Sequence, residues 1–320
     1  MLDGAVRQLK SVYTMDEAPG NWYLKVRVER SPDGRYMTMS QPDYAQDIVR
    51  TMGLEECNPA KTPMEDPLCK GAFDPFTEEE MEFMQSKAAE YGTVVGMLTH
   101  LTNMTRPDLA YAVGQLQRFT SDPRKKHWDA MKRVVRYLKG TVNYGLVFDR
   151  ARQDRMIIAA ADSDWASDVD DRKSTSGYVF TYMGTVFAWK SKKQSDTGPA
   201  RSSATAELRA LDMAVRQARW LRKMHQALQM DGPSTITIFE DNQACKHLAN
   251  GSQWSNETKH VATQYFAVRD DVQAQRVFVE SIASSENPAD LFTKPLKHTL
   301  YCKFRSMLGI MDVTQFGVRS

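Results

Sequence analysis

The sequence has 320 residues, of which 42% are hydrophobic and 26% charged, and its formal net charge is +2. This composition is that of a globular protein, and no apolar run approaches the roughly 20 residues that a membrane-spanning helix needs, so we expect no membrane partner. The near-neutral charge excludes a uniformly basic protein, so any contact with nucleic acid must come from local clusters.

The cysteine and histidine content predicts an intracellular protein, cytoplasmic or nuclear, without a zinc site. None of the four cysteines forms a C-x-x-C pair, and the six histidines lack the spacing of metal ligands. The N-terminus carries no basic and then apolar stretch typical of a signal peptide. Four reduced thiols are the interpretation that fits these features.

Residues 22–54 are expected to form two strands and a helix. The stretch 22–28 is rich in β-branched and aromatic residues, and 36–39 can pair back on it across a Ser-Pro-Asp-Gly turn. A helix is expected over 44–52, and the prolines of 61–80 predict a tether that runs over a surface.

Residues 78–139 are predicted to be helical. In the last helix, apolar residues recur at helical spacing and form one stripe, Trp128, Met131, Val135 and Leu138. Gly140 stands where this helix should end. The basic residues of the same helix are candidates for nucleic-acid contacts: Lys132, Arg133, Arg136 and Lys139. We expect Lys132, Arg136 and Lys139 on a solvent-facing stripe.

From residue 141 to 296, strands and helices alternate, which favours a mixed sheet flanked by helices. The predicted order is three strands, a long helix, a strand, helices, a strand and a short helix after Pro288. The strands are expected at 156–161, 177–180, 186–189, 235–240 and 277–281, and the long helix at 204–228, with Ser202 or Ser203 as its N-cap.

Four acidic residues stand at the ends or starts of these elements. Asp162 ends the first strand, Glu207 lies in the first turn of the long helix, Asp241 ends the fourth strand and Asp290 lies in the last short helix. Strand ends and helix starts converge on one rim of such a sheet, where ligands bind. Each residue alone is more often a turn former or a helix-dipole partner. Together they predict one acidic pocket.

Four carboxylates repel one another unless cations accompany them. Mg²⁺ prefers oxygen ligands, and two such ions can activate a water and stabilise the leaving oxygen of a phosphodiester. The pattern therefore predicts a pair of Mg²⁺ ions, with Mn²⁺ as a substitute.

Ordered motifs along most of the chain resemble the Pol polyproteins of Ty1/copia retrotransposons. DSDWA at 162–166, DRKSTSGY at 171–178, WKSKKQ at 189–194, DNQA at 241–244, TKHV at 258–261 and ADLFTKPL at 289–296 resemble their ribonuclease H domain. TRPDLAYAV at 105–113 and RYLKGT at 136–141 resemble the thumb and connection of their reverse transcriptase.

The resemblance implies an α/β fold with an α+β N-terminal part. It implies a ribonuclease H-like mixed five-stranded sheet with flanking helices, preceded by palm-end strands and a helical thumb. The implied domains are the truncated end of the palm at 1–60, a tether at 61–80, the thumb and connection at 81–150, ribonuclease H at 151–297, and a C-terminal tail at 298–320.

The activity implied by the resemblance is metal-dependent hydrolysis of the RNA strand of RNA–DNA hybrids. Asp162, Glu207, Asp241 and Asp290 would be the catalytic, metal-binding residues. Lys190, Lys192 and His260 join the basic helix as nucleic-acid contacts. Other parts of the Pol polyprotein are expected as partners in an intact element.

Two other functions remain open at this stage. The Tyr-x-Asp-Asp signature of the polymerase is absent, so we expect no DNA polymerase activity, and the chain can be a non-catalytic remnant that at most binds nucleic acid. An integrase-like nuclease would use two aspartates and a late glutamate. Here the glutamate, Glu207, comes second, which favours ribonuclease H.

Overall fold

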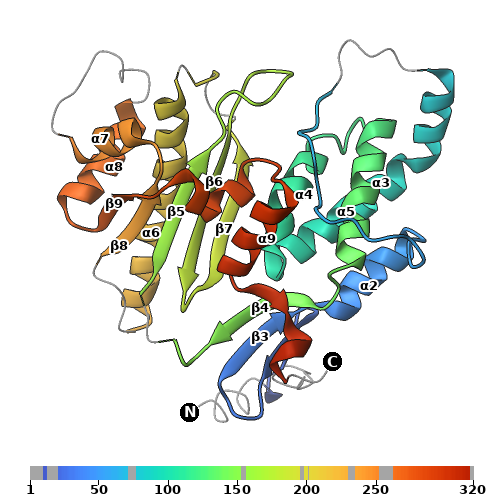
Figure 1. Ribbon diagram of the computed structural model, residues 1–320, viewed down its shortest axis with the longest axis horizontal. Coiled ribbons are helices and arrows are strands. Elements are labelled where there is room, and N and C mark those ends of the chain that lie inside the picture. Colours follow the sequence, from blue (N-terminus) through green and yellow to red (C-terminus); the bar gives the residue numbers. More distant parts are fainter. Residues whose placement is uncertain are drawn as a thin grey trace.

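The computed structural model describes residues 10–12, 21–70, 77–152, 156–194, 198–200, 202–229, 235–251 and 262–317. Two five-stranded sheets organise these residues, and helices lie between and beside the sheets (Figure 1). Over these ranges, every helix is too short or too polar to cross a membrane.

The first sheet is antiparallel and draws its strands from both ends of the chain. Its order is β1 (Trp22–Tyr23), β2 (Val26–Arg30), β3 (Tyr36–Ser40), β4 (Tyr144–Asp149) and β10 (Ile310–Asp312). The β2–β3 hairpin confirms the predicted pairing. The single strand expected over 22–28 is wrong, because Leu24 and Lys25 adopt φ angles of 49° and 65° and turn the chain back between β1 and β2.

Helices from the first half of the chain pack together beside this sheet. They are α2 (Pro42–Thr51), α3 (Glu78–Met104), the short 3-10 turn η1 (Pro107–Leu109), α4 (Ala110–Gln117) and α5 (Lys125–Lys139). The stripe predicted on α5 is buried at all of its apolar positions, Trp128, Met131, Val135 and Leu138. Gly140 is the C-cap of α5, as expected.

The second sheet is mixed and confirms the predicted five-stranded arrangement with flanking helices. Its order is β7 (Thr185–Lys193), β6 (Thr175–Tyr182), β5 (Ile158–Ser163), β8 (Ile236–Glu240) and β9 (Val277–Ser281). The pairs β5–β6 and β6–β7 are antiparallel, whereas β5–β8 and β8–β9 are parallel. The parallel pairing brings the carboxyl ends of β5 and β8 to the same edge.

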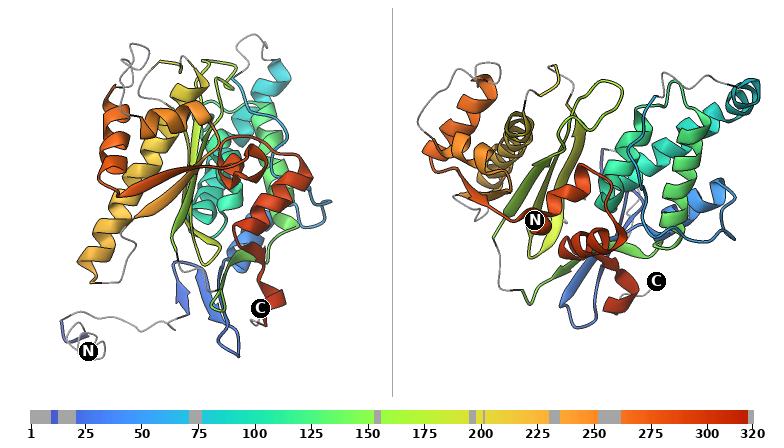
Figure 2. Two further views of the ribbon diagram at one scale, coloured as in Figure 1. Left: turned by 60° about the vertical axis from the view of Figure 1, so that its left-hand side comes forward. Right: turned by 45° about the horizontal axis from the view of Figure 1, so that its top comes forward.

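Both faces of the second sheet are covered (Figures 1 and 2). On one face, Ala159 and Ala161 pack in a core with α6 (Ser203–Ala227), α7 (Gln243–Asn250) and α8 (Ala262–Gln273). On the other face, Ala160 and Val179 belong to the core that α3, α4 and α5 share with η4 (Pro288–Phe292) and α9 (His298–Met307). Alternate residues of β5 therefore serve different cores, as a strand periodicity of two requires.

The segment 298–317, expected within a C-terminal tail, is folded. It forms α9, β10 and the turn η5 (Val313–Phe316), and β10 completes the first sheet beside β4. Tyr301 and Phe304 of α9 are buried, and the Tyr301 hydroxyl donates to the carbonyl of Asp108 at 2.9 Å. The core on this side thus runs across the boundary predicted at residue 150, while the assignment of palm, thumb and nuclease domains stays a prediction.

Candidate metal centre

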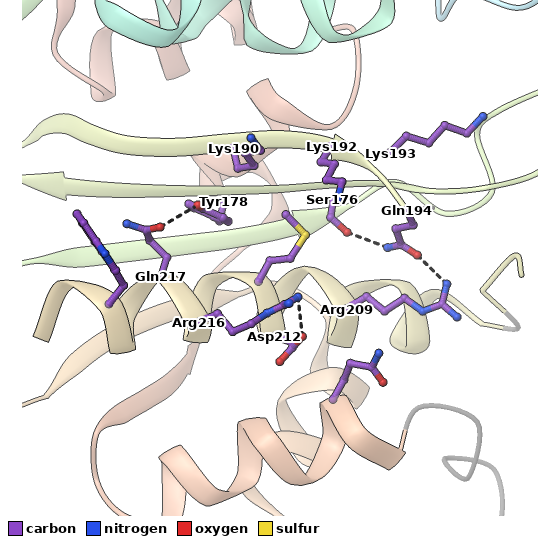
Figure 3. A pocket seen from close by; sticks show the side chains of 13 residues that line it. Ser176, Tyr178, Lys190, Lys192, Lys193, Gln194, Arg209, Asp212, Arg216 and Gln217 are labelled. Atoms are coloured by element: carbon purple, nitrogen blue, oxygen red, sulfur yellow. Dashed lines mark hydrogen bonds and ion pairs between the residues drawn. The ribbon is translucent and has the colours of Figure 1, made fainter. Parts of the chain in front are cut away.

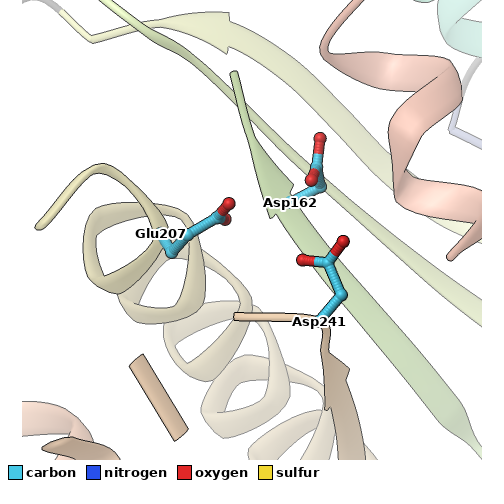
Figure 4. A group of neighbouring side chains, drawn as sticks. All are labelled: Asp162, Glu207 and Asp241. Carbon is cyan, nitrogen blue, oxygen red and sulfur yellow. The ribbon is translucent and has the colours of Figure 1, made fainter. Parts of the chain in front are cut away.

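Three of the four predicted carboxylates meet at the edge where β5 and β8 end. Asp162 lies near the end of β5, Asp241 directly follows β8, and Glu207 reaches them from α6 (Figure 4). Each offers a carboxylate oxygen, and these oxygens all lie within 4.8 Å of one another. The parallel strands supply the two aspartates, and the helix crosses over them with the glutamate.

The N-terminus of α6 fixes the position of Glu207. The side chain of Ser202 accepts a hydrogen bond from the backbone N–H of Thr205 at 3.2 Å and is the N-cap of the helix, one of the two predicted. Glu207 is the fifth residue of α6 and so lies just beyond the first turn in which the sequence placed it. From there its side chain points across the end of β5 toward Asp162.

The site suits a hard divalent cation. Glu207 is buried, and its Oε2 atom accepts no hydrogen bond from the part of the chain that the structure describes. Burial, together with the charges of Glu240, Asp162 and Asp241, raises the pKa of Glu207 to about 11. An unpartnered buried carboxylate beside two others is costly on its own, and a divalent cation with a preference for oxygen ligands would offset that cost.

Asp290 lies beside Asp162 but outside the group of three. The ammonium of Lys294 lies between them, 2.7 Å from Asp290 Oδ1 and 3.9 Å from Asp162 Oδ2. Thr293 also donates a hydrogen bond from its hydroxyl to Asp162 Oδ2. Burial and the charge of Asp162 raise the pKa of Asp290 to about 7. The fourth predicted carboxylate therefore reaches the site together with a lysine.

The structure adds two residues to the site that sequence reasoning did not assign, besides Lys294. Glu240 is fully buried near the three carboxylates, whose charges it feels, and burial raises its pKa to about 8. Strand alternation was the available signal, because it places Glu240 on the same covered face as Ile236 and Ile238. Gln194 donates to Ser163 Oγ at 3.2 Å and to the carbonyl of Ala206 at 3.1 Å, and so ties the ends of β5 and α6 together.

A basic groove leads away from Gln194 between α6 and the β6–β7 strands (Figure 3). It encloses about 490 Å³, and Lys190 and Lys192, two of the predicted nucleic-acid contacts, line it from β7. Arg209 lines it from α6 and donates to Gln194 Oε1 at 3.0 Å. Both lysines are exposed, whereas Lys193 on the same strand is ion-paired with Asp168. The groove thus begins at the residue that bridges β5 and α6.

Three of the four predicted basic residues of α5 contact the segment 57–65, which leads into the predicted tether. Arg136 Nε donates to the carbonyl of Asn58 at 2.8 Å, and Lys139 Nζ donates to the carbonyl of Cys57 at 2.6 Å. Arg133 pairs with Glu65 at 2.6 Å. Lys132 pairs within the helix, with Asp129 at 3.4 Å. These contacts give α5 a role in holding residues 57–65, and nucleic-acid binding by its four cations stays a prediction. The predicted contact His260 lies outside the described residues.

Known proteins resemble the chain along nearly its whole length, although it matches no protein-family model. It is 31% identical over 302 residues to the retrovirus-related Pol polyprotein from transposon TNT 1-94 of Nicotiana tabacum, a match that covers 94% of this chain and 22% of that protein. It is also 31% identical over 222 residues to an uncharacterized mitochondrial protein of Arabidopsis thaliana, covering 69% of this chain and 86% of that protein.

Among solved structures, ribonuclease H1 from Halobacterium salinarum is similar to 43% of the chain. The match covers 94% of that structure at 18% identity, with a TM-score of 0.34. The chain spans about a fifth of the length of the transposon Pol polyproteins that it matches.

Proposed function

This chain belongs to the Ty1/copia-type family of retrotransposon Pol polyproteins, and we propose that it is a metal-dependent ribonuclease that hydrolyses the RNA strand of RNA–DNA hybrids. The observation that carries the proposal is the convergence of Asp162, Glu207 and Asp241, whose oxygens lie within 4.8 Å of one another at one edge of a mixed sheet. Because the matched relatives are much longer proteins, we propose the remaining parts of a Pol polyprotein as its partners.

The four carboxylates would act as ligands of two divalent ions. Asp162, Glu207 and Asp241 would hold one divalent ion, and Asp162 with Asp290 would hold a second. When bound, such ions supply an activated water and stabilise the leaving oxygen of the phosphodiester. The protein orients these ligands through Thr293, which donates to Asp162, and through Gln194, which joins β5 to α6.

The groove beside the centre is the proposed path of the nucleic acid. Lys190 and Lys192 line it with free access to solvent, and no ion pair is recorded for either within the described ranges. Such lysines would contact phosphates, which position a duplex without reading its sequence. Recognition of the RNA strand itself would rest on its 2′-hydroxyl groups and on the shape of the hybrid.

The direct test is cleavage of a labelled RNA–DNA hybrid by the purified chain. We expect cleavage of the RNA strand in Mg²⁺ or Mn²⁺ and none in excess chelator. Asp241→Asn should lower the rate by more than the roughly 10–100-fold that loss of an outer-shell partner costs, because it removes a metal-binding charge. Thermal melting should also rise on addition of Mn²⁺ in the wild type and much less in the variant.

Asp270→Asn is the matched control, because Asp270 is an exposed carboxylate on α8 in the same half of the molecule. It should leave both cleavage and the Mn²⁺-induced rise in melting temperature unchanged. Cleavage in chelator, or equal rates for Asp241→Asn and the wild type, would rule out the proposed mechanism. A folded wild-type chain that neither cleaves nor responds to metal would instead identify a non-catalytic remnant.

The groove has its own test in the salt dependence of hybrid binding. Replacing Lys190 and Lys192 with Ala should weaken binding and flatten the plot of log affinity against log salt by about one unit per lost contact. Lys303→Ala is the control, since Lys303 lies on α9, over the opposite face of the sheet. An unchanged slope in the double variant would show that these lysines are merely solvated.

A further inference from the structure

The two sides of the acidic site differ in whether a basic side chain of the protein lies beside the carboxylates. On the side where Asp162 meets Glu207 and Asp241, no lysine or arginine among the described residues forms an ion pair with Glu207 or Asp241. Where Asp162 faces Asp290, the ammonium of Lys294 lies between the two carboxylates, at 2.7 Å from Asp290 and 3.9 Å from Asp162. A protein cation therefore already occupies one of the two places that the carboxylates offer to a metal.

Hydrogen bonds and buried side chains hold the backbone around Lys294 in place. Asn287 donates to the carbonyl of Ala161 at 2.9 Å and accepts from the backbone N–H of Ala289 at 3.1 Å, which anchors η4 to the strand that carries Asp162. Leu291 and Phe292 of η4 are buried. The backbone N–H of Lys294 donates to the backbone carbonyl of Asp290 at 3.3 Å. The Lys294 side chain therefore starts close to the Asp290 side chain.

The side chain of Lys294 is nevertheless partly open to solvent. The side chain of Lys294 is 40% exposed, whereas those of Asp162 and Asp290 are 3% and 6% exposed. A lysine has a flexible four-carbon stem, so its ammonium can swing into water while the carboxylates stay in place. The ion pair thus joins a partly exposed, flexible lysine to two buried carboxylates, and the lysine is the partner that can leave.

We propose that Lys294 is an intrinsic competitor for the second divalent ion, which binds between Asp162 and Asp290 only when the Lys294 ammonium moves aside. The first ion binds at Asp162, Glu207 and Asp241 and meets less of this competition, because only Asp162 of these three pairs with Lys294, at the longer distance of 3.9 Å. The inference rests on the proposed metal-dependent function and adds to it an unequal pair of ion sites. A single positive charge suffices to hold Asp290 near Asp162 before the metal arrives, and the divalent ion brings the larger charge once it is abundant.

The test is the binding of Mn²⁺ to the full chain, followed by calorimetry and by the loss of the free-ion paramagnetic resonance signal. The wild type should show a tighter and a weaker binding step. In Lys294→Met, which keeps the length of the side chain without its charge, the weaker step should move to a concentration lower by about tenfold or more. Lys294→Arg retains the charge and should keep two steps as widely separated as those of the wild type.

Lys303→Met is the matched control, because Lys303 pairs with Glu286 near the same end of the chain and contacts neither site aspartate. Its two steps should match those of the wild type. An unchanged or weaker second step in Lys294→Met overturns the inference, the latter because Lys294 would then be needed to position the carboxylates. A wild type that binds no Mn²⁺ at all removes the proposed metal-dependent function instead, so the two failures are distinguishable.

Discussion

Arg106 and Asp108 form a fully buried ion pair just before α4. Arg106 donates from Nε and Nη2 to the two carboxylate oxygens of Asp108 at 2.9 and 2.8 Å, and from Nη1 to the carbonyl of Thr141 at 2.8 Å. The Tyr137 hydroxyl donates to the same carboxylate at 2.8 Å. Such a pair adds little beyond an apolar replacement, but loss of one partner leaves a buried charge uncompensated.

We therefore expect Asp108→Asn to lower the free energy of unfolding by about 3–5 kcal/mol at neutral pH. Burial opposes ionisation of Asp108, but Arg106 outweighs it, so the pKa of Asp108 lies below its ordinary value of 3.8. A lowered pKa contributes stability above the ordinary value, which is lost as the pH falls through the lowered one. The difference between wild type and variant should thus be large above about pH 4 and shrink below it.

Urea unfolding at a series of pH values measures this difference. Asp47→Asn is the control, since Asp47 pairs with Arg50 on the exposed side of α2 and both side chains are largely solvated. It should have little effect at any pH, because exposed ion pairs are screened by water and salt. A small effect of Asp108→Asn at neutral pH would show that Arg106 finds another partner.

At the scale of elements, the close approach of η4 to β6 depends on Gly177. Gly177 pairs with Asp162 in the β5–β6 register. A Cβ atom at this position would lie 2.8 Å from Phe292 Cβ and 2.8 Å from Thr293 Cγ2. These distances are too short for any real contact, so only glycine lets η4 lie against the strand and bring Asp290 to the site.

Gly177→Ala should therefore push η4 off the sheet. We expect a loss of hybrid cleavage and a higher Mn²⁺ requirement, because Asp290, Thr293 and Lys294 would all move away from Asp162. Cleavage rates across a range of Mn²⁺ concentrations measure both effects.

Gly96→Ala provides the control for this substitution. Gly96 lies inside α3, and a Cβ there has no atom within 4 Å. It should leave cleavage unchanged and should raise stability by up to about 1 kcal/mol, since alanine favours the helix. Normal activity in Gly177→Ala would mean that η4 tolerates the displacement and does not position the site.

At the scale of the whole molecule, the two sheets are joined by the C-terminal segment. β10 pairs with β4 in the first sheet, while α9 lies in the core that also takes in Ala160 and Val179 of the second sheet. Phe304 of α9 is fully buried in this core. The segment after residue 297 is thus part of the structure that supports the site.

Phe304→Ala should consequently lower the free energy of unfolding by about 3–5 kcal/mol, as expected for a large cavity in a close-packed core. Chemical denaturation followed by tryptophan fluorescence measures this loss. Met307→Ala is the control on the same helix, because Met307 is 41% exposed and should cost far less. A mild effect of Phe304→Ala would show that α9 is dispensable and that the second sheet folds without it.

The sequence by itself determined the features that depend on local periodicity. The apolar stripe of α5, the capped start of α6 and the strands that carry Asp162 and Asp241 follow from spacings of two or of three to four residues, because such spacings decide which face of an element is covered. Together with the start of α6, which carries Glu207, those strands sufficed to name the three carboxylates that converge. The break in the strand at Leu24–Lys25 could not be predicted, because no glycine in the sequence marks its positive φ angles.

Only the tertiary structure decided which distant segments meet. The three-residue strand β10 forms by pairing with β4. Arg136 and Lys139 of α5 donate to the backbone carbonyls of residues 58 and 57, and Lys294 pairs with both Asp162 and Asp290. The local sequence around each of these groups fits exposure to solvent equally well. A short polar segment or a single charged side chain has no periodic pattern from which its partner could be predicted. The packing of the two hydrophobic cores determined these partners, and the sequence pattern of one segment carries no information about that packing.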